Sequence, residues 1–164
     1  MSMSSSNMLP TKSSLLPDVA HDPAALARPM DWVGMEKIAL PVRIQDAEGN
    51  AVQVAASVDV AVDLRDASAR GIHMSRLYLQ LQEAFASEAV TPPGLRRVLQ
   101  GFVESQGGLS SRARLHVRYE HLLLRPALES GHAGWKRYPV EIEAELAEGH
   151  FQLALKFSVE YSSI

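Results

Sequence analysis

The chain has 164 residues, with 16 Lys and Arg against 19 Asp and Glu, and it contains no cysteine. Its length suits a single domain, which buries roughly 68–70% of its unfolded surface. The formal charge of −3 argues against nucleic acid as a partner, because proteins that bind nucleic acid carry a basic field.

No stretch approaches the ~18 consecutive apolar residues of a membrane span. The first residues are rich in serine and lack the apolar core of a secretory signal. The absence of cysteine excludes disulfides, thiolate nucleophiles and cysteine-ligated metal sites within this chain. We therefore expect a cytoplasmic protein with neither nucleic acid nor membrane as a partner.

The N-terminal region divides into two parts. Residues 1–13 are polar and of low complexity, which predicts a disordered tail. Residues 14–32 contain Pro17, Pro23 and Pro29, and each proline removes a backbone donor and favours extended geometry before it. We expect an irregular arm over 14–32 and one folded module over 33–164.

Two strands open the module. Residues 38–45 form a short apolar run that ends in a polar turn over 46–50. From Val52 to Val62, apolar residues alternate with small and polar ones, which indicates a half-buried antiparallel strand. The polar side of this strand faces water, another subunit or a ligand.

Two helices follow. Leu77, Leu81 and Phe85 recur at a spacing of four residues and predict a helix over about 75–87. A second helix starts after Thr91 as its N-cap, carries Pro92 and Pro93 in its first turn, and stops near 107–108, where two glycines stand. The short connection between them predicts an antiparallel pair.

Three strands close the chain, over about 112–123, 140–146 and 151–159, each with alternating apolar residues. We expect a long connection over 126–139 and a tight hairpin turn at Glu148 and Gly149. The order is ββααβββ, an α+β fold with two antiparallel helices on one face of an antiparallel sheet.

The other sheet face is charged. One predicted strand presents Arg112, Arg114, His116 and Arg118, and the next presents Glu141, Glu143 and Glu145. If these strands pair, opposite charges meet at separations worth about 0.2–1 kcal/mol per pair. The pattern leaves two alternatives open: a solvated, charge-paired face, or the polar lining of a barrel built by several subunits.

The junction over 70–76 precedes the first helix, a position where backbone N–H groups favour an anion. His73 is a candidate acid, base or metal ligand, Ser75 a candidate cap, and Arg76 a candidate partner for phosphate or carboxylate. The alternative is that Ser75 only caps the helix and the other two are ordinary surface residues. No histidine spacing predicts a self-contained metal site, and no P-loop, dinucleotide-binding or nucleophile-elbow motif is present.

Three segments together resemble one family, the type IB GTP cyclohydrolases. They are LPDVAHDPAALARPMDWVGMEKIALPVRI over 16–44, ARGIHMSRLY over 69–78, and YPVEIEAELAEGHFQLALKFSVEYSS over 138–163. The string GIHMSR after a Val-rich strand is the most specific part. The resemblance covers about residues 15–163 and corresponds to the N-terminal half of the family.

The resemblance implies an enzyme (EC 3.5.4.16) that converts GTP and water to 7,8-dihydroneopterin triphosphate and formate, at the start of tetrahydrofolate biosynthesis. It also implies the tunnelling fold, in which antiparallel sheets backed by helices assemble into a barrel around a central tunnel. Family chains carry two such modules and form homotetramers.

The family's zinc or manganese is bound by a cysteine of a Cys-Pro-Cys motif and by later His and Glu residues, which would follow the end of this chain. We therefore expect no catalytic residue and no metal ligand within this chain, which would be a truncated product or a fragment and inactive alone. His73, Ser75 and Arg76 remain candidates for binding substrate. The alternatives are a non-catalytic assembly or binding module, and another pterin enzyme of the same fold.

Overall fold

The computed structural model describes residues 30–66, 68–69 and 71–161. The tail predicted over 1–13 and most of the arm predicted over 14–32 lie outside the described residues, whereas residues 30–32 belong to the first strand. The elements, in chain order, are β1 (Met30–Gln45), β2 (Ala51–Leu64), α1 (Met74–Ser87), α2 (Pro92–Ser105), β3 (Arg112–Pro126), β4 (Ala133–Ala147) and β5 (His150–Phe157). The predicted order ββααβββ is confirmed.

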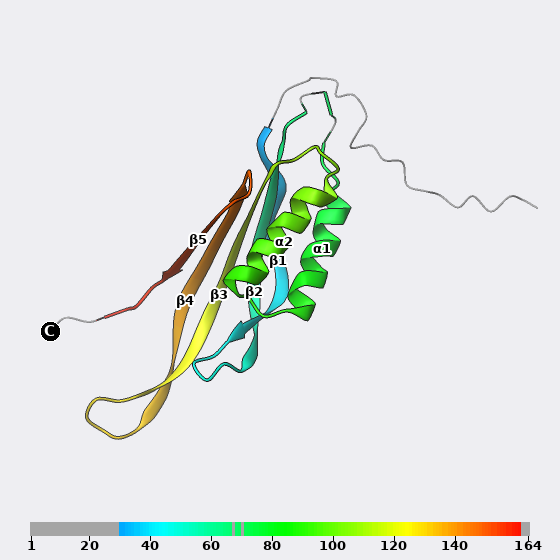
Figure 1. Ribbon diagram of the computed structural model, residues 1–164. Helices are drawn as coiled ribbons and strands as arrows, with labels where there is room; N and C mark the ends of the chain where they lie inside the picture. The colour runs from blue at the N-terminus through cyan, green and yellow to red at the C-terminus, as the bar shows by residue number, and fades with distance from the viewer. Residues whose placement is uncertain (1–29, 67, 70, 162–164) are drawn as a thin grey trace, which may run out of the picture.

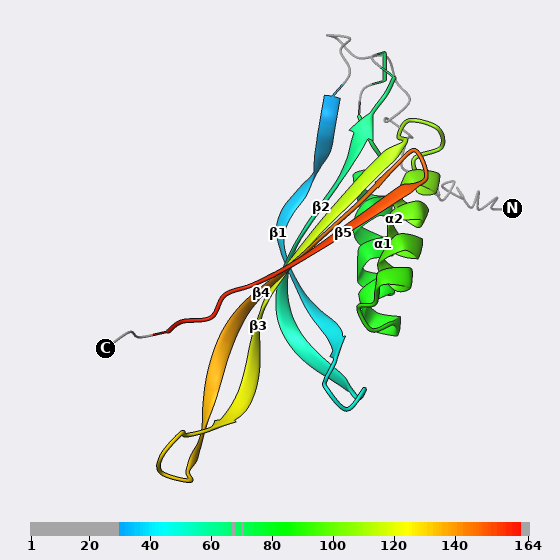
Figure 2. The same ribbon diagram turned by 60° about the vertical axis from the view of Figure 1, so that its left-hand side comes forward.

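The five strands form one antiparallel sheet in the order β1-β2-β3-β4-β5, so every strand pairs with its neighbour in sequence. The sheet is strongly twisted, and both helices lie on the same side of it (Figures 1 and 2). Helix α1 packs on β1, and α2 packs on β3 and β4. The predicted α+β fold with two helices on one face is therefore confirmed.

The core lies between the helices and the alternating residues of β1 to β4. Leu77, Leu81 and Phe85 of α1 are buried at their predicted spacing, as are Leu95, Leu99 and Phe102 of α2. Facing them, every second residue of the part of the sheet beneath the helices is buried, including Val58, Val60, Val62, Leu115, Val117, Ile142 and Leu146. This burial fixes the register, because a slip of one residue would turn each apolar set to the opposite face.

The two hairpin turns form as their sequences indicate. Asp46 Oδ1 accepts hydrogen bonds from the backbone N–H groups of Glu48 and Asn50, which closes the turn between β1 and β2. Between β4 and β5, Glu148 and Gly149 have φ of 50° and 79°. Two consecutive residues with positive φ match the right-handed twist of the strands on both sides, so a two-residue hairpin results.

The predicted long connection over 126–139 is wrong. Strands β3 and β4 stay paired from Glu120 opposite Pro139 to Pro126 opposite Ala133, and only residues 127–132 join them. Figures 1 and 2 show this ribbon extending away from the helices. Since neither helix and no other described element covers the ribbon there, Leu122, Leu124 and Trp135 are exposed and the alternation that marks a half-buried strand is lost.

Strand β5 also departs from the prediction, because the helices do not cover it. The strand ends at Phe157 rather than at 159. Its apolar residues share the helix-side face, yet Leu155 and Phe157 are 62% and 68% exposed. The apolar edge of the sheet at β5 is therefore open among the described residues.

Candidate functional site

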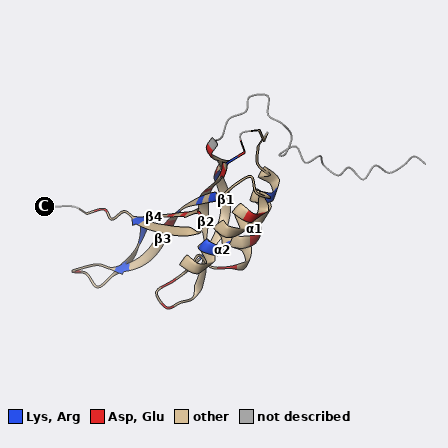
Figure 3. Ribbon diagram, turned by 45° about the horizontal axis from the view of Figure 1, so that its top comes forward, with Lys and Arg blue, Asp and Glu red and all other residues tan. Residues whose placement is uncertain are grey.

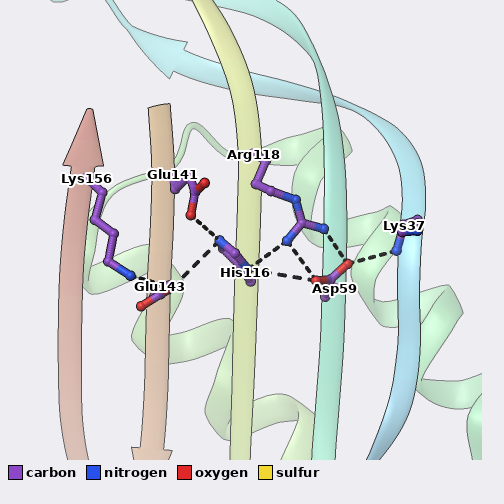
Figure 4. A network of polar contacts seen from close by, with 7 residues as sticks. All are labelled: Lys37, Asp59, His116, Arg118, Glu141, Glu143 and Lys156. Carbon is purple, nitrogen blue, oxygen red and sulfur yellow. Dashed lines mark hydrogen bonds and ion pairs between the residues drawn. The ribbon is translucent and has the colours of Figure 1, made fainter. Parts of the chain in front are cut away.

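The sheet face opposite the helices carries a connected polar network that spans all five strands. Its members are Lys37 of β1, Asp59 of β2, His116 and Arg118 of β3, Glu141 and Glu143 of β4, and Lys156 of β5 (Figure 4). The alternation of strand side chains explains their common face, because the buried residues of β2, β3 and β4 alternate with them. Elsewhere, acidic and basic residues are interspersed over the fold (Figure 3).

At the β1 edge, the network includes a residue of a β-bulge. The pairing of β1 with β2 shifts register between Met35 and Ile38, and Lys37 within the shift has φ of 57°. A bulged residue leaves its backbone groups outside the strand ladder. The N–H of Lys37 instead donates to Asp59 Oδ1 at 2.8 Å. The bulge thus supplies a backbone donor that orients this carboxylate.

Asp59 is paired with Arg118 of the neighbouring strand. Arg118 Nη1 donates to Asp59 Oδ2 at 2.8 Å, and Nη2 donates to Oδ1 at 2.7 Å. These side-chain hydrogen bonds, against the cost of burial, hold the pKa of Asp59 below its usual value, and the same bonds raise the pKa of Arg118. The two-pronged geometry fixes both side chains more firmly than a single ion pair would.

His116 lies at the centre of the network, and its neighbours define its protonation. Arg118 Nη1 lies 2.7 Å from His116 Nδ1, and a guanidinium can only donate, so Nδ1 accepts. The ring proton is then on Nε2, which lies 2.9 Å from Glu141 Oε2 and donates to it. The hydrogen bonds thus favour the tautomer with its ring proton on Nε2.

Glu143 and Lys156 complete the network at the β5 edge. Lys156 Nζ lies 2.8 Å from Glu143 Oε1, and His116 Nε2 lies 3.8 Å from the same oxygen. The ion pair lowers the pKa of Glu143 and raises the pKa of Lys156, chiefly through their hydrogen bond. Both side chains are about half exposed, so water screens this pair.

The predicted pairing of β3 with β4, with basic residues of one strand facing glutamates of the other, is confirmed, although the guanidinium groups have other partners. Arg114 lies opposite Glu145 and Arg118 lies opposite Glu141, as expected. The guanidinium of Arg118 turns instead to Asp59 on the other neighbouring strand, and that of Arg114 lies 4.4 Å from the ring centroid of Trp32. A cation–π contact with Trp32 thus takes the place of an ion pair for Arg114. For Arg118, the carboxylate of Asp59 takes the place of the directly opposite glutamate.

A groove of about 1100 Å³ opens beside the network on the same face. Trp32 and Gly34 of β1 line one side, and Glu145 and Gln152 line the other. A Cβ atom on Gly34 would lie 1.9 Å from the carbonyl oxygen of Val60, so glycine is required where β1 approaches β2 so closely. His116, Asp59 and Glu143 also border the groove.

The predicted substrate-binding residues lie in the helix layer, away from this groove. His73 is the N-cap residue of α1 but its side chain makes no capping bond, and Ser75 is exposed within the first turn. The prediction that Ser75 caps the helix is therefore wrong. Arg76 is exposed, and its guanidinium donates to the backbone oxygen of Ser105 at 3.3 Å.

Sequence reasoning missed two buried polar residues that hold these elements together. Gln106, which follows α2, hydrogen-bonds the backbone of His73. Asp63 accepts hydrogen bonds from the backbone N–H groups of Ser111 and Arg112 at the start of β3. Both lie at the ends of elements, where their partners depend on tertiary packing and leave no local sequence signal.

The network contains one set of residues with metal-ligand chemistry. Donor atoms of His116, Glu141 and Glu143 lie within 4.8 Å of one another. One imidazole and two carboxylates are donors that zinc and manganese accept. Histidine spacing alone did not indicate this set, because two of its donors come from the neighbouring strand. The sequence predicts no metal ligand in this chain. The structure nevertheless contains three residues with the donor chemistry to bind such an ion.

Fold and site together describe an α+β module with a helix-covered apolar face and an ordered, charged groove face. A sequence model of the family described as "Type I GTP cyclohydrolase folE2" matches residues 16–164. The chain belongs to this family, which confirms the resemblance found in the sequence.

Two curated relatives quantify the similarity. GTP cyclohydrolase FolE2 of Pseudomonas putida (strain GB-1) is 47% identical over 148 residues, which is 90% of this chain and 47% of the relative. GTP cyclohydrolase FolE2 of Xanthomonas campestris pv. campestris (strain B100) is 42% identical over 154 residues, 92% of this chain and 49% of the relative. The chain therefore spans about half the length of the curated relatives it matches.

Among the described residues, neither helix is long and apolar enough to cross a membrane. This finding agrees with the absence of a long apolar run in the sequence.

Proposed function

We propose that this chain supplies about half of a GTP cyclohydrolase that converts GTP and water to 7,8-dihydroneopterin triphosphate and formate, at the start of tetrahydrofolate biosynthesis. The observation that carries the proposal is the family match over residues 16–164, together with 47% identity to a relative named for this activity. The fold supports it, since the observed ββααβββ order is the order expected for one tunnelling-fold module.

We further propose that the module works in a homo-oligomer, a tetramer as the family resemblance implies, with its charged face lining a central tunnel. Two features support this arrangement. The network from Lys37 to Lys156 is ordered by short hydrogen bonds although it lies on the uncovered face of the sheet. The β5 edge exposes Leu155 and Phe157, which is a surface that a neighbouring subunit or module would bury.

The reaction needs water that attacks the imidazole ring of guanine at neutral pH. A bound zinc or manganese ion supplies such a nucleophile by lowering the pKa of its water toward ~7. Among the described residues, His116, Glu141 and Glu143 have the donor chemistry to hold such an ion. The thiolate that the resemblance implies has no counterpart in a chain without cysteine. We therefore propose that the 164-residue chain does not turn over GTP by itself.

His73, Ser75 and Arg76 are the proposed contacts for the triphosphate. They stand at the start of α1, where first-turn N–H groups favour an anion and where the first turn itself contains no acidic residue. The guanidinium of Arg76 is exposed and retains free donors beside its bond to Ser105. A charge-assisted hydrogen bond of this kind contributes about 1.5–3 kcal/mol to binding.

This site is tested by Arg76→Ala in the fused enzyme described below, with Arg96→Ala on the exposed side of α2 as the matched control. The loss of one charge-assisted contact predicts a KM for GTP about tenfold higher or more, with a smaller change in kcat. An unchanged KM for Arg76→Ala would remove this residue from the site.

A non-catalytic binding or assembly module is the second candidate, and the lack of cysteine favours it. The two are separated by fusing this chain in frame to the part of the P. putida relative that lies outside the matched stretch. With zinc or manganese present, we expect the fusion to release formate and a pteridine in equal amounts from GTP. A folded, metal-loaded fusion that releases neither, while the P. putida protein releases both, would favour the non-catalytic module.

A further inference from the structure

The histidine and the two glutamates of the polar network are placed as three ligands of one ion. We propose that His116, Glu141 and Glu143 bind a divalent transition-metal ion at the groove, using residues of this chain alone. The inference does not rest on the proposed function, because it concerns metal binding and not turnover.

The spacing of the donor atoms fits the proposal. Ligand atoms that lie 2.0–2.2 Å from a tetrahedral zinc ion are separated from one another by about 3.3–3.5 Å. His116 Nε2 lies 2.9 Å from Glu141 Oε2 and 3.8 Å from Glu143 Oε1, and all three donor atoms lie within 4.8 Å. The two separations measured from His116 Nε2 lie on either side of this value.

A fourth residue is positioned as the outer partner of the histidine. A metal-bound histidine usually donates its other ring N–H to a carboxylate, which fixes the ring and its tautomer. Asp59 Oδ2 lies 3.8 Å from His116 Nδ1, on the side of the ring opposite the glutamates. The N–H of Lys37 and the guanidinium of Arg118 hold Asp59 in place independently of His116.

Metal binding therefore requires a change of tautomer. In the metal-free network Nε2 carries the ring proton and donates to Glu141. When Nε2 binds the ion, the proton moves through solvent to Nδ1 and faces Asp59, and the contact between Nδ1 and Arg118 lengthens. Arg118 keeps its two hydrogen bonds to Asp59.

The charges and the free space around the cluster also favour a cation. The network as a whole is charge-balanced, with Asp59, Glu141 and Glu143 against Lys37, Arg118 and Lys156, but the two glutamates give the proposed ligand set itself two negative charges. The ammonium group of Lys156 forms an ion pair with Glu143, and the Lys156 side chain is 60% exposed. An incoming metal ion therefore displaces this ammonium group into water at little cost. The groove beside His116 leaves room for water at the remaining coordination positions.

The test uses the full 164-residue chain without a histidine tag, stripped with a chelator and titrated with Co²⁺ and then Zn²⁺ alone. We expect one equivalent of Co²⁺ to bind, with the visible absorption of a low-coordinate site, and Zn²⁺ to displace it. Glu143→Gln, which preserves size, and His116→Ala should each weaken binding about 100-fold or more, and Asp59→Asn about 10–100-fold. His150→Ala, an exposed histidine at the start of β5, is the matched control and should bind as the wild type does.

The variant Lys156→Met distinguishes a metal site from a purely structural ion-pair network. Because the ammonium competes for Glu143, its removal should tighten Co²⁺ binding several-fold. Binding that is equally strong in wild type, His116→Ala and Glu143→Gln would indicate an adventitious ion only and would overturn the proposal. The absence of any stoichiometric binding by the folded wild type would overturn it as well.

Discussion

The side-chain amide of Gln106 holds the backbone of His73, although the two residues are 33 positions apart. Gln106 Oε1 accepts from the His73 N–H at 2.7 Å, and Nε2 donates to the His73 carbonyl oxygen at 3.5 Å. The side chain of Gln106 is fully buried. The end of α2 therefore fixes the start of α1, where the proposed triphosphate contacts lie.

Replacing Gln106 by leucine should destabilise the protein. The change keeps the volume but leaves the part-buried N–H of His73 without this acceptor, while its carbonyl oxygen keeps the hydrogen bond from the Leu77 N–H, which predicts a loss of about 1–3 kcal/mol. Urea unfolding followed by circular dichroism measures it. Gln100→Leu, the same change at an exposed position of α2, should alter stability by no more than about 0.5 kcal/mol. Equal stability of the two variants would show that the amide contacts with His73 contribute little.

Gly34→Ala should also be destabilising, for a steric reason. The new methyl group would lie 1.9 Å from the carbonyl oxygen of Val60, so β1 must move away from β2. Overpacking of this kind costs about 1–3 kcal/mol. Gly134→Ala in β4 meets nothing within 4 Å and serves as the control, with little effect on the thermal midpoint. A Gly34→Ala variant as stable as that control would contradict the close approach of the two strands.

Much of the fold could be predicted because its signals are local and periodic. The alternation in β2 and the spacing of Leu77, Leu81 and Phe85 identify their elements and their buried faces. The ribbon over 120–139 could not be predicted this way. It is exposed on both faces, so burial imposes no alternation, and its prolines and glycines suggest a loop.

The residues of the candidate site could be predicted from the sequence, but the contacts between them could not. The sequence identifies Arg118, His116 and Glu141 as polar-face residues, since period two places them there. Which neighbour each one contacts depends on distances across three strands and on the bulge at Lys37, which supplies a donor to Asp59. No pattern along the chain records that bulge.

Asp59 should make stability depend on pH. Its hydrogen bonds with Arg118 lower the pKa of Asp59 in the folded state. The contribution of Asp59 to the free energy of unfolding is therefore complete above its pKa in the unfolded chain, about 3.9, and is lost as the pH falls through its lower pKa in the folded state. The difference in unfolding free energy between wild type and Asp59→Asn should thus be largest near neutral pH and shrink in acid.

Urea unfolding at intervals from about pH 6 to about pH 3 measures this difference. Glu129→Gln, in the exposed loop between β3 and β4, is the control and should differ from wild type by a constant amount. A constant difference for Asp59→Asn as well would contradict the assigned role of its pairing with Arg118.

The exposed apolar edge at β5 predicts self-association. Wild-type chain should sediment as a multiple of its 17.9 kDa mass, and Leu155→Glu should shift it toward the monomer, because a charge in a buried contact is unfavourable. Leu128→Glu, at a fully exposed loop position, should leave the mass unchanged. A wild-type chain that sediments as a stable monomer would argue against assembly through this edge.

The central claim is that this module acts on GTP only as part of a larger assembly. Formate release measured on the 164-residue chain alone, with added zinc or manganese and beside the fused enzyme at equal concentration, tests it most directly. We predict formate from the fusion and none above background from the chain alone. Multiple turnovers by the chain alone would contradict the claim.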